Sequence, residues 1–173
     1  LEVGEFFKKG KKKKEIFFST YMCHPTMAND NLSSVALQIY LINYLEKKYK
    51  NSKYSYRFVF LPETIGSIAY LEKNFKIMKK NIIAGYILTC VGDNRNYSYL
   101  ETRQEFFLTN KIAIHVLRHI TKKPKIYDWS DRGSDERQYC SPKINLPLGV
   151  LSRTKFGEYK EYHTSSDQIG KVV

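Results

Sequence analysis

A histidine and an aspartate lie six residues apart in the segment CHPTMANDN, and both are residue types that bind zinc. His24 and Asp30 stand between an apolar run, residues 16–22, and an amphipathic run, residues 32–45. That order predicts a strand-to-helix junction, which is where open α/β sheets place their sites. A simpler interpretation also fits this segment alone, because an aspartate at this place could serve only to cap the amino terminus of the helix.

Two further residues could complete a catalytic site. Glu63 follows a strand-like run, so we expect it at the mouth of the sheet, where a carboxylate with few partners can act as a general base. The alternative is an acid that stabilises the amino terminus of the following helix through its dipole. His163 lies in a polar loop and has two carboxylates nearby in the sequence, which makes it the best partner for His24.

The two remaining histidines, His115 and His119, are four residues apart, a spacing that can bind zinc from one face of a helix. Val116 follows the first of them, where the zinc-protease helix motif has a glutamate. The surrounding helix is amphipathic and basic, so we interpret this pair as surface or packing histidines.

The three cysteines form no even disulfide framework. Cys90 lies in an apolar strand-like run, as expected of a reduced, buried thiol, and this favours a cytoplasmic setting. Cys23 is adjacent to His24, but neighbouring residues on a strand face opposite sides, so we expect its thiol to point away from that histidine. Cys140 lies near two acidic residues, which would raise the pKa of its thiol and disfavour a role as nucleophile.

Hydrophobic periodicity divides the chain into alternating strands and helices. It predicts strands over residues 3–7, 15–21, 54–61, 82–91, 97–101, 125–127 and 146–151. It predicts helices over residues 32–48, 67–78, 109–120 and 134–139, with a further helix beginning near residues 165–167. We expect the first two strands to pair as a hairpin with a solvated lysine-rich tip, and Thr109 to cap the third helix. The alternation predicts a three-layer α/β/α fold with a mixed, mostly parallel sheet.

Length and composition favour one globular domain over residues 1–173. Hydrophobic residues make up 42% of the chain, and no apolar run approaches the ~20 residues that a membrane span needs. The first residue is Leu1 rather than Met, so we expect the domain to be a fragment of a longer protein.

The formal net charge of +12 raises the question of nucleic-acid binding. Eight lysines fall in two clusters, residues 8–14 and residues 79–80. Nucleic-acid surfaces interleave basic residues with stacking aromatics on one face, whereas the aromatics here mostly alternate inside strands. We therefore expect a lysine-rich surface that does not bind nucleic acid.

Several segments together resemble a known family. CHPTMANDNLSS is similar to the histidine-then-helix element of the zinc-dependent aminopeptidases of the aminopeptidase S and transferrin-receptor type. LPETIGS is similar to their strand-end glutamate motif, and EYHTSSD to their late histidine motif. The runs GSDERQYCSPKINLPLG and RTKFGEYKEYHTSSD resemble a subgroup more closely, the aminopeptidase-like proteins encoded with bacterial surface-polysaccharide biosynthesis genes. The motifs span residues 23–167, which is nearly the whole chain.

The resemblance implies a zinc-exopeptidase-like fold and a metal-dependent hydrolase that cleaves an amide bond in a small peptide, an aminoacyl group or a sugar amide. It implies that His24, Asp30 and His163 bind the metal, and that Glu63 is the general base that takes a proton from a zinc-activated water. These roles agree with zinc chemistry, since three protein ligands leave one coordination position open. Near these motifs, the candidates for substrate contact or oxyanion stabilisation are Arg137, Arg153 and Tyr162.

Two positions depart from the family's pattern. The di-zinc enzymes follow the base with a second glutamate, where this chain has Thr64, and their next aspartate ligand would fall near Thr89. Asp93 is four residues further on, which places it far along the loop. These departures favour one zinc ion over two. The alternative function is a catalytically inactive relative that keeps the peptidase fold as a binding or scaffold protein.

Overall fold

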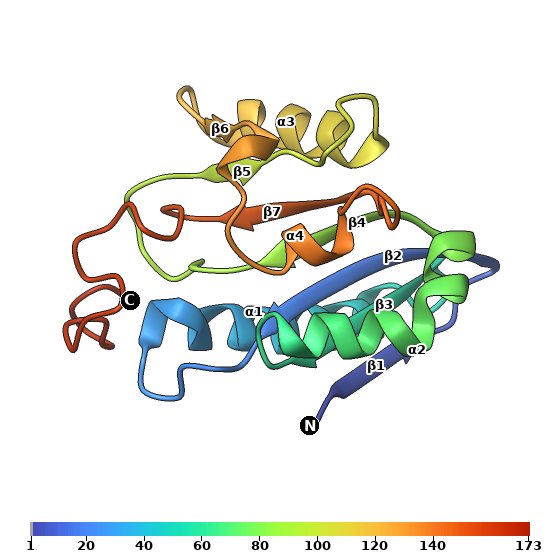
Figure 1. Cartoon of the computed structure of the whole chain (residues 1–173), viewed down its shortest axis with the longest axis horizontal. Coiled ribbons are helices and arrows are strands. Elements are labelled where there is room, and N and C mark those ends of the chain that lie inside the picture. Colours follow the sequence, from blue (N-terminus) through green and yellow to red (C-terminus); the bar gives the residue numbers. More distant parts are fainter. Residues whose placement is uncertain (1) are drawn as a thin grey trace.

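Apolar runs of the sequence form the centre of a seven-stranded sheet in the computed structural model, which describes residues 2–173 (Figure 1). The strands lie in the order β1-β3-β2-β4-β7-β5-β6. Their bounds are β1 (Gly4–Lys8), β2 (Lys12–Tyr21), β3 (Tyr54–Leu61), β4 (Ile82–Leu88), β5 (Ser98–Leu100), β6 (Lys125–Tyr127) and β7 (Leu148–Ser152). The neighbours β3, β2, β4 and β7 run parallel, whereas β1 and β5 are antiparallel to β3 and β7, respectively. The mixed, mostly parallel sheet is therefore confirmed.

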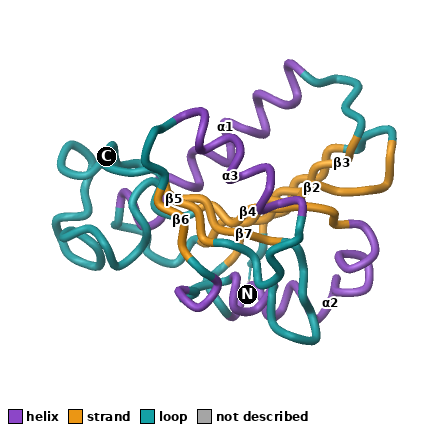
Figure 2. The backbone as a smooth tube through the Cα atoms, turned by 90° about the horizontal axis from the view of Figure 1, so that it is seen from above, coloured by secondary structure: helices purple, strands orange, loops and turns teal. Residues whose placement is uncertain are grey.

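Helices cover both faces of this sheet, as Figure 2 shows. They are α1 (Ser33–Lys48), α2 (Ile65–Asn81), α3 (Leu108–Ile120) and α4 (Glu136–Tyr139), with two short helical segments, η1 (Ala28–Leu32) and η2 (Trp129–Asp131). Helices α1 and α3 lie on one face and α2 lies on the other (Figure 2), where α4 contacts both α2 and β7. The predicted three-layer α/β/α architecture is confirmed.

Strand β2 is anchored at the centre because its side chains are covered on both faces, as is typical of parallel sheets. Phe17 is fully buried and packs edge-on against Tyr139 at 5.6 Å between ring centroids, next to Tyr70. Phe18 points to the opposite face and stacks on Phe58 at 4.9 Å. The loop that leaves the carboxyl end of β2 therefore starts from a closely packed, buried part of the sheet.

The predicted hairpin between the first two strands is wrong, because β1 pairs with β3 and β3 lies between β1 and β2. The connection crosses the start of β3 instead of turning tightly, and the Gly10 N–H donates to Ser55 Oγ at 3.0 Å. Only glycine fits there, since a Cβ on Gly10 would lie 2.2 Å from the carbonyl oxygen of Tyr54. Nor is the lysine cluster entirely a solvated tip: Lys8 is buried and pairs with Glu46 at 2.7 Å.

Two other predictions also fail. Helix α3 begins at Leu108 without a side-chain cap, and the Thr109 hydroxyl donates instead to the carbonyl oxygen of Pro147 at 2.7 Å. No helix forms near residues 165–167, where the chain continues in turns. This irregular segment packs through Tyr159 and Val172 against Cys90, so tertiary contacts replace helical hydrogen bonds.

No helix in residues 2–173 is both long enough and apolar enough to cross a bilayer.

Candidate metal centre

The carboxyl ends of β2 and β3 lie side by side, and the residues singled out in the sequence gather at this edge of the sheet. His24 follows the end of β2, Asp30 lies in η1, and Glu63 follows the end of β3. His163 arrives from the irregular segment after β7, which runs beside the start of α1 (Figure 1). Because β2 and β3 are parallel neighbours, their ends deliver these side chains to one place.

His24, Asp30 and His163 form a cluster in which one possible ligand atom from each residue lies within 4.8 Å of the others. His163 Nε2 is 2.9 Å from Asp30 Oδ2, and His24 Nδ1 is 3.9 Å from the same oxygen. The aspartate side chain is 1% exposed, whereas the side chains of His24 and His163 are 27% and 48% exposed. Two accessible imidazoles therefore face one buried carboxylate.

Neighbouring groups fix the orientation of the Asp30 carboxylate. The Tyr21 hydroxyl donates to Oδ1 at 2.6 Å, and it also lies 2.6 Å from Thr89 Oγ1. Burial raises the pKa of Tyr21 well above its ordinary value, and the charges of Cys90 and Asp30 add to the shift. The phenol therefore stays protonated as a donor, which holds Oδ1 and leaves Oδ2 facing the histidines.

Asp30 does not cap the helix, although the sequence allowed that interpretation. Helix α1 starts after Leu32 with no side-chain cap. The acceptor at this end of the segment is Asp167, whose carboxylate receives the backbone N–H of Asn29 at 2.6 Å and that of Asp30 at 3.1 Å. With Asp167 in this role, the Asp30 side chain is left to face the two imidazoles.

The ring of His163 is held by its own backbone and by Tyr162. His163 has a φ of +54°, in the left-handed region that few non-glycine residues adopt. Its imidazole stacks on the Tyr162 ring at 3.9 Å between centroids, and Tyr162 packs edge-on against Tyr159 at 5.5 Å. A strained residue in such packed surroundings is typical of a functional site.

Glu63 lies beside this cluster. Its Oε2 is 3.7 Å from Cys23 Sγ, which in turn lies 3.1 Å from His24 Nδ1. The Ser134 hydroxyl donates to Glu63 Oε1. One oxygen of Glu63 is therefore held by the protein while the other faces the side of the histidines.

Two buried acids, Asp135 and Glu136, hold the backbone next to Glu63 and that of its partner Ser134. The sequence did not indicate this role. Glu136 Oε1 accepts the backbone N–H of Ser134 at 2.9 Å, and Asp135 Oδ1 accepts the backbone N–H of Thr64 at 2.7 Å. The second oxygen of each acid is buried without a hydrogen-bond partner in the described protein. Burial raises the pKa of Asp135 to about 7 and raises that of Glu136. Residues 134–136, at the start of α4, thus fix both Glu63 and the residue that follows it.

The prediction that Cys23 points away from His24 is wrong. Strand β2 ends at Tyr21, so side-chain alternation no longer applies two residues later. Burial raises the pKa of Cys23 to about 12, and the nearby charge of Glu63 contributes, which keeps the group a thiol. The pKa of Cys140 is also raised to about 12, chiefly by burial and further by the charge of Glu136. The predicted direction for Cys140 is confirmed.

The resemblance implies additional metal ligands at or near Thr64, Thr89 and Asp93, but each of these residues makes other contacts. Thr89 is the partner of Tyr21, and the backbone N–H of Thr64 is bound by Asp135. The Asp93 carboxylate is occupied by Thr154, whose N–H and hydroxyl donate to it at 2.9 and 2.7 Å. Within residues 2–173, only His24, Asp30 and His163 group as possible metal ligands.

The three candidates for substrate contact lie in different surroundings. Tyr162 stacks on His163, and the charge of Asp30 adds to the rise that burial causes in the pKa of Tyr162. Arg153 is engaged elsewhere, since its Nε donates to the carbonyl oxygen of Asn96 at 2.6 Å and its guanidinium lies over Tyr97. Arg137 lines a separate pocket on the outer side of α4. Only Tyr162 contacts the histidine–aspartate cluster directly.

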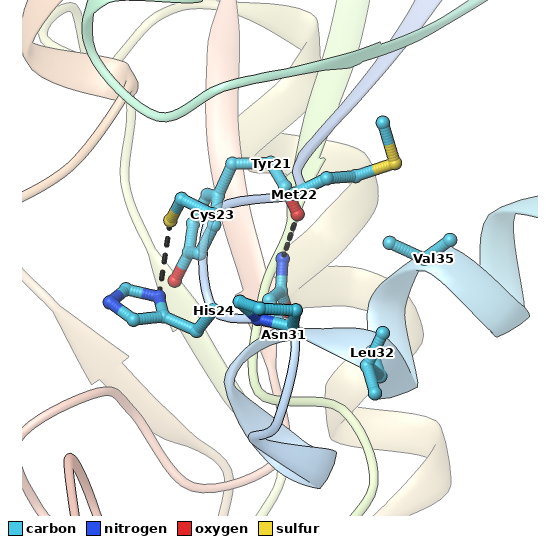
Figure 3. A pocket seen from close by; sticks show the side chains of 8 residues that line it. Tyr21, Met22, Cys23, His24, Asn31, Leu32 and Val35 are labelled. Carbon is cyan, nitrogen blue, oxygen red and sulfur yellow. Dashed lines mark hydrogen bonds between the residues drawn. The ribbon is translucent and has the colours of Figure 1, made fainter.

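A cavity of about 300 Å³ adjoins the cluster, and Figure 3 shows its lining. Cys23 and His24 stand at one end of this group, and the apolar side chains of Met22, Leu32 and Val35 lie away from the imidazole (Figure 3). The cavity therefore offers an apolar surface next to a polar, titratable one, which is typical of small-molecule sites.

Comparisons with known proteins identify the family of the chain and relatives of similar fold. The family described as "Domain of unknown function (DUF4910)" matches residues 1–173. A protein of Clostridium acetobutylicum, whose name assigns it to polysaccharide biosynthesis and gives it an aminopeptidase-like domain, is 45% identical over 169 residues. That match covers 98% of this chain but 38% of the relative, so the chain spans well under half of the protein it resembles.

Solved structures give the same result at the level of the fold. A crystal structure described as that of a peptidase from Clostridium acetobutylicum superposes with a TM-score of 0.93 at 43% identity, over 99% of this chain and 40% of the other. BSAP, a zinc aminopeptidase from Bacillus subtilis, superposes with a TM-score of 0.76 at 15% identity, over 99% of this chain and 45% of the other. The chain therefore belongs to the DUF4910 family and has the fold of zinc exopeptidases.

Proposed function

We propose that this chain forms the metal-binding and hydrolytic centre of an aminopeptidase-like enzyme that cleaves an amide bond. The observation that carries the proposal is the position of Glu63 beside two histidines that face one buried aspartate. The aminopeptidase-like relatives support it, although the chain covers only part of their length.

The residues of the cluster fit a zinc ion. Two imidazoles and a carboxylate are a donor set that zinc takes in catalytic sites, where three protein ligands leave one position open. Asp30 is buried and pairs with no lysine or arginine among the described residues, so a cation between the imidazoles would neutralise it. We expect His24, Asp30 and His163 to hold one ion, which supplies Lewis acidity toward the carbonyl oxygen of the amide.

Two other side chains would act on the substrate. Glu63 accepts a proton from the attacking water and returns it to the leaving amine, while Ser134 holds the far oxygen of its carboxylate. Tyr162 donates to the oxygen that becomes negative in the transition state, because burial keeps its phenol protonated.

The substrate is an amide in a small peptide, an aminoacyl group or an amide-linked sugar. The name of the Clostridium relative favours a precursor of a surface polysaccharide. The cavity beside His24 would receive an apolar group of that substrate, since Leu32 and Val35 line it. A panel of aminoacyl amides with apolar, charged and sugar substituents would identify the preferred class.

The substitution Glu63→Gln tests the proposed mechanism. It removes the proton acceptor but keeps the size of the side chain, so we expect turnover to fall by about 10²–10⁴-fold with unchanged metal content. The matched control is Glu72→Gln on the surface of α2, which should leave both turnover and metal content unchanged. Elemental analysis and a continuous amide-hydrolysis assay measure the two quantities.

Other outcomes would reject the proposal in distinguishable ways. Undiminished turnover in Glu63→Gln would contradict the assignment of the base. One equivalent of zinc with no hydrolysis by the unsubstituted chain would favour the alternative, a binding or scaffold protein. No zinc in protein from metal-replete cells would contradict the metal site itself.

A further inference from the structure

Three arginines from separate segments surround a pocket that contains none of the residues of the metal centre. Arg103 follows β5, Arg132 follows η2, and Arg137 lies in α4. The pocket has a volume of about 320 Å³, and the side chains of Trp129, Gln138 and Ser141 complete most of its lining. Arg103 and the closely spaced Arg132 and Arg137 thus bring three positive charges to one concave surface.

No carboxylate forms a close ion pair with these arginines in the described part of the chain. Nor does any acidic side chain among residues 2–173 line the pocket. Asp128 accepts the backbone N–H of Ser130 at 2.8 Å, and hydrogen bonds from Ser130 lower the pKa of Asp128, with a further contribution from the charge of Arg132. Arg132 lies over the Trp129 ring at 5.1 Å from the centroid, so an aromatic face borders the charged group.

Guanidinium groups arranged in this way suit an oxyanion. Each presents a planar fork of N–H donors that matches a carboxylate or phosphate group, and such charge-assisted hydrogen bonds are among the strongest in proteins. Three like charges around one concavity repel each other until an anion enters, and the neutral Gln138 and Ser141 offer additional hydrogen bonds. We propose that this pocket binds the phosphate or carboxylate group of a small molecule.

The position of the pocket also connects it with the rest of the fold. Arg132 and Arg137 flank residues 133–136, the segment that carries Ser134 and the two buried acids. Neighbouring side chains of α4 point in opposite ways, since Glu136 is fully buried and Arg137 is exposed. Binding of an anion here requires neither the metal nor hydrolysis.

The chain contains one tryptophan, and that residue lines the pocket, so its fluorescence reports binding directly. Titration with glucose 6-phosphate, glucuronate and inorganic phosphate at constant ionic strength should give a saturable change in emission, whereas glucose should give none. We expect Arg103→Gln and Arg137→Gln to weaken binding by about tenfold each, since each removes a charge-assisted contact. Because Arg132 lies over the fluorophore, Arg132→Gln is measured by calorimetry instead.

Arg118→Gln is the matched control, because it removes the same charge from α3 outside the pocket. Thermal unfolding followed by circular dichroism verifies that each variant is folded. Tighter binding of glucose 6-phosphate assigns the pocket to phosphate, and tighter binding of glucuronate assigns it to carboxylate. The proposal is overturned if no anion saturates the signal by about 10 mM, or if Arg118→Gln weakens binding as much as Arg137→Gln.

Discussion

The chain contains two pairs of histidines whose rings nearly touch, and only one pair resembles a metal site. The ring centroids of His115 and His119 are 4.4 Å apart, closer than the 4.9 Å between His24 and His163. The first pair comes from adjacent turns on the exposed face of one helix, so its spacing follows from helix geometry alone. The second pair joins residues from opposite ends of the chain and encloses the buried carboxylate of Asp30.

The difference shows that proximity of imidazoles is not sufficient for a site. On α3, His119 Nδ1 lies 2.8 Å from the backbone oxygen of His115, so one ring nitrogen is engaged by the helix itself. At the metal centre, both rings face a carboxylate whose other oxygen is already bound by Tyr21. A buried anion held in a fixed orientation provides the electrostatic reason for a cation to bind between these two histidines.

The largest expected effect follows from removing that anion. Asp30→Ala should abolish stoichiometric zinc binding and lower the free energy of unfolding by about 3 kcal/mol, because the Tyr21 hydroxyl and the His163 imidazole lose their shared partner. Elemental analysis and urea denaturation measure the two effects. Glu105→Ala, beside the other histidine pair, should change stability by less than about 0.5 kcal/mol. If the Asp30→Ala variant retained one zinc ion, the buried carboxylate would not be the feature that distinguishes the two histidine pairs.

Removal of one ring from each pair tests the comparison directly. His163→Ala should weaken zinc binding by more than about a hundredfold, since loss of an outer-shell partner alone costs 10–100-fold. His119→Ala should leave the affinity unchanged, because that ring faces no buried acid. Competition with a chromophoric chelator measures both constants. If His119→Ala released the metal and His163→Ala did not, the metal would lie on α3.

A comparison of Asp30 with a second buried aspartate shows what burial alone does to a carboxylate when no histidine is nearby. Asp135 is as buried as Asp30 but faces no imidazole, and burial raises its pKa to about 7. The folded state then holds the proton more tightly than the unfolded chain, so stability should fall as pH rises from about 4 to about 7 and remain level above that. Asp135→Asn should make this loss smaller by about 2 kcal/mol.

Urea denaturation at several pH values measures this difference. The raised pKa of Glu136 acts in the same direction, and Glu136 is present in both proteins. Parallel stability–pH curves for the two proteins would contradict the buried, protonated state of Asp135. They would also remove the proposed difference between Asp30, which a cation would neutralise, and Asp135, which a bound proton would neutralise.

Most of the fold could be predicted because its strands carry strong local patterns. Residues 54–61 were predicted as a strand and form β3 with the same bounds, since aromatic and aliphatic side chains fill both faces. The pairing of β1 could not be predicted, because alternation of polar and apolar residues does not encode which strand becomes the neighbour. The role of Thr109 could not be predicted for a similar reason, since its hydroxyl donates to the backbone of Pro147, which is distant in the sequence.

In the candidate site, too, some residues could be predicted from the sequence and others could not. The sequence placed His24 and Glu63 at strand ends and indicated His163 as the partner of His24, and the fold brings His163 to Asp30. The supporting residues were not recognisable, because Asp135 and Glu136 lie in a polar segment that is typical of a surface. Asp167 binds the backbone of Asn29 across most of the chain, and no local pattern carries that contact.

The smallest expected effect concerns Cys23, which lies between His24 and Glu63 and has no counterpart at the pair on α3. Cys23→Ser keeps a small donor beside His24 Nδ1, so we expect zinc affinity to change by less than about threefold and stability by less than about 0.5 kcal/mol. Absorption spectra of the cobalt-substituted proteins provide the decisive measurement, since a thiolate ligand gives an intense near-ultraviolet band. Its presence in the unsubstituted chain and loss in the variant would make sulfur a fourth ligand. Identical spectra would leave the buried carboxylate of Asp30 as the feature that separates the two histidine pairs.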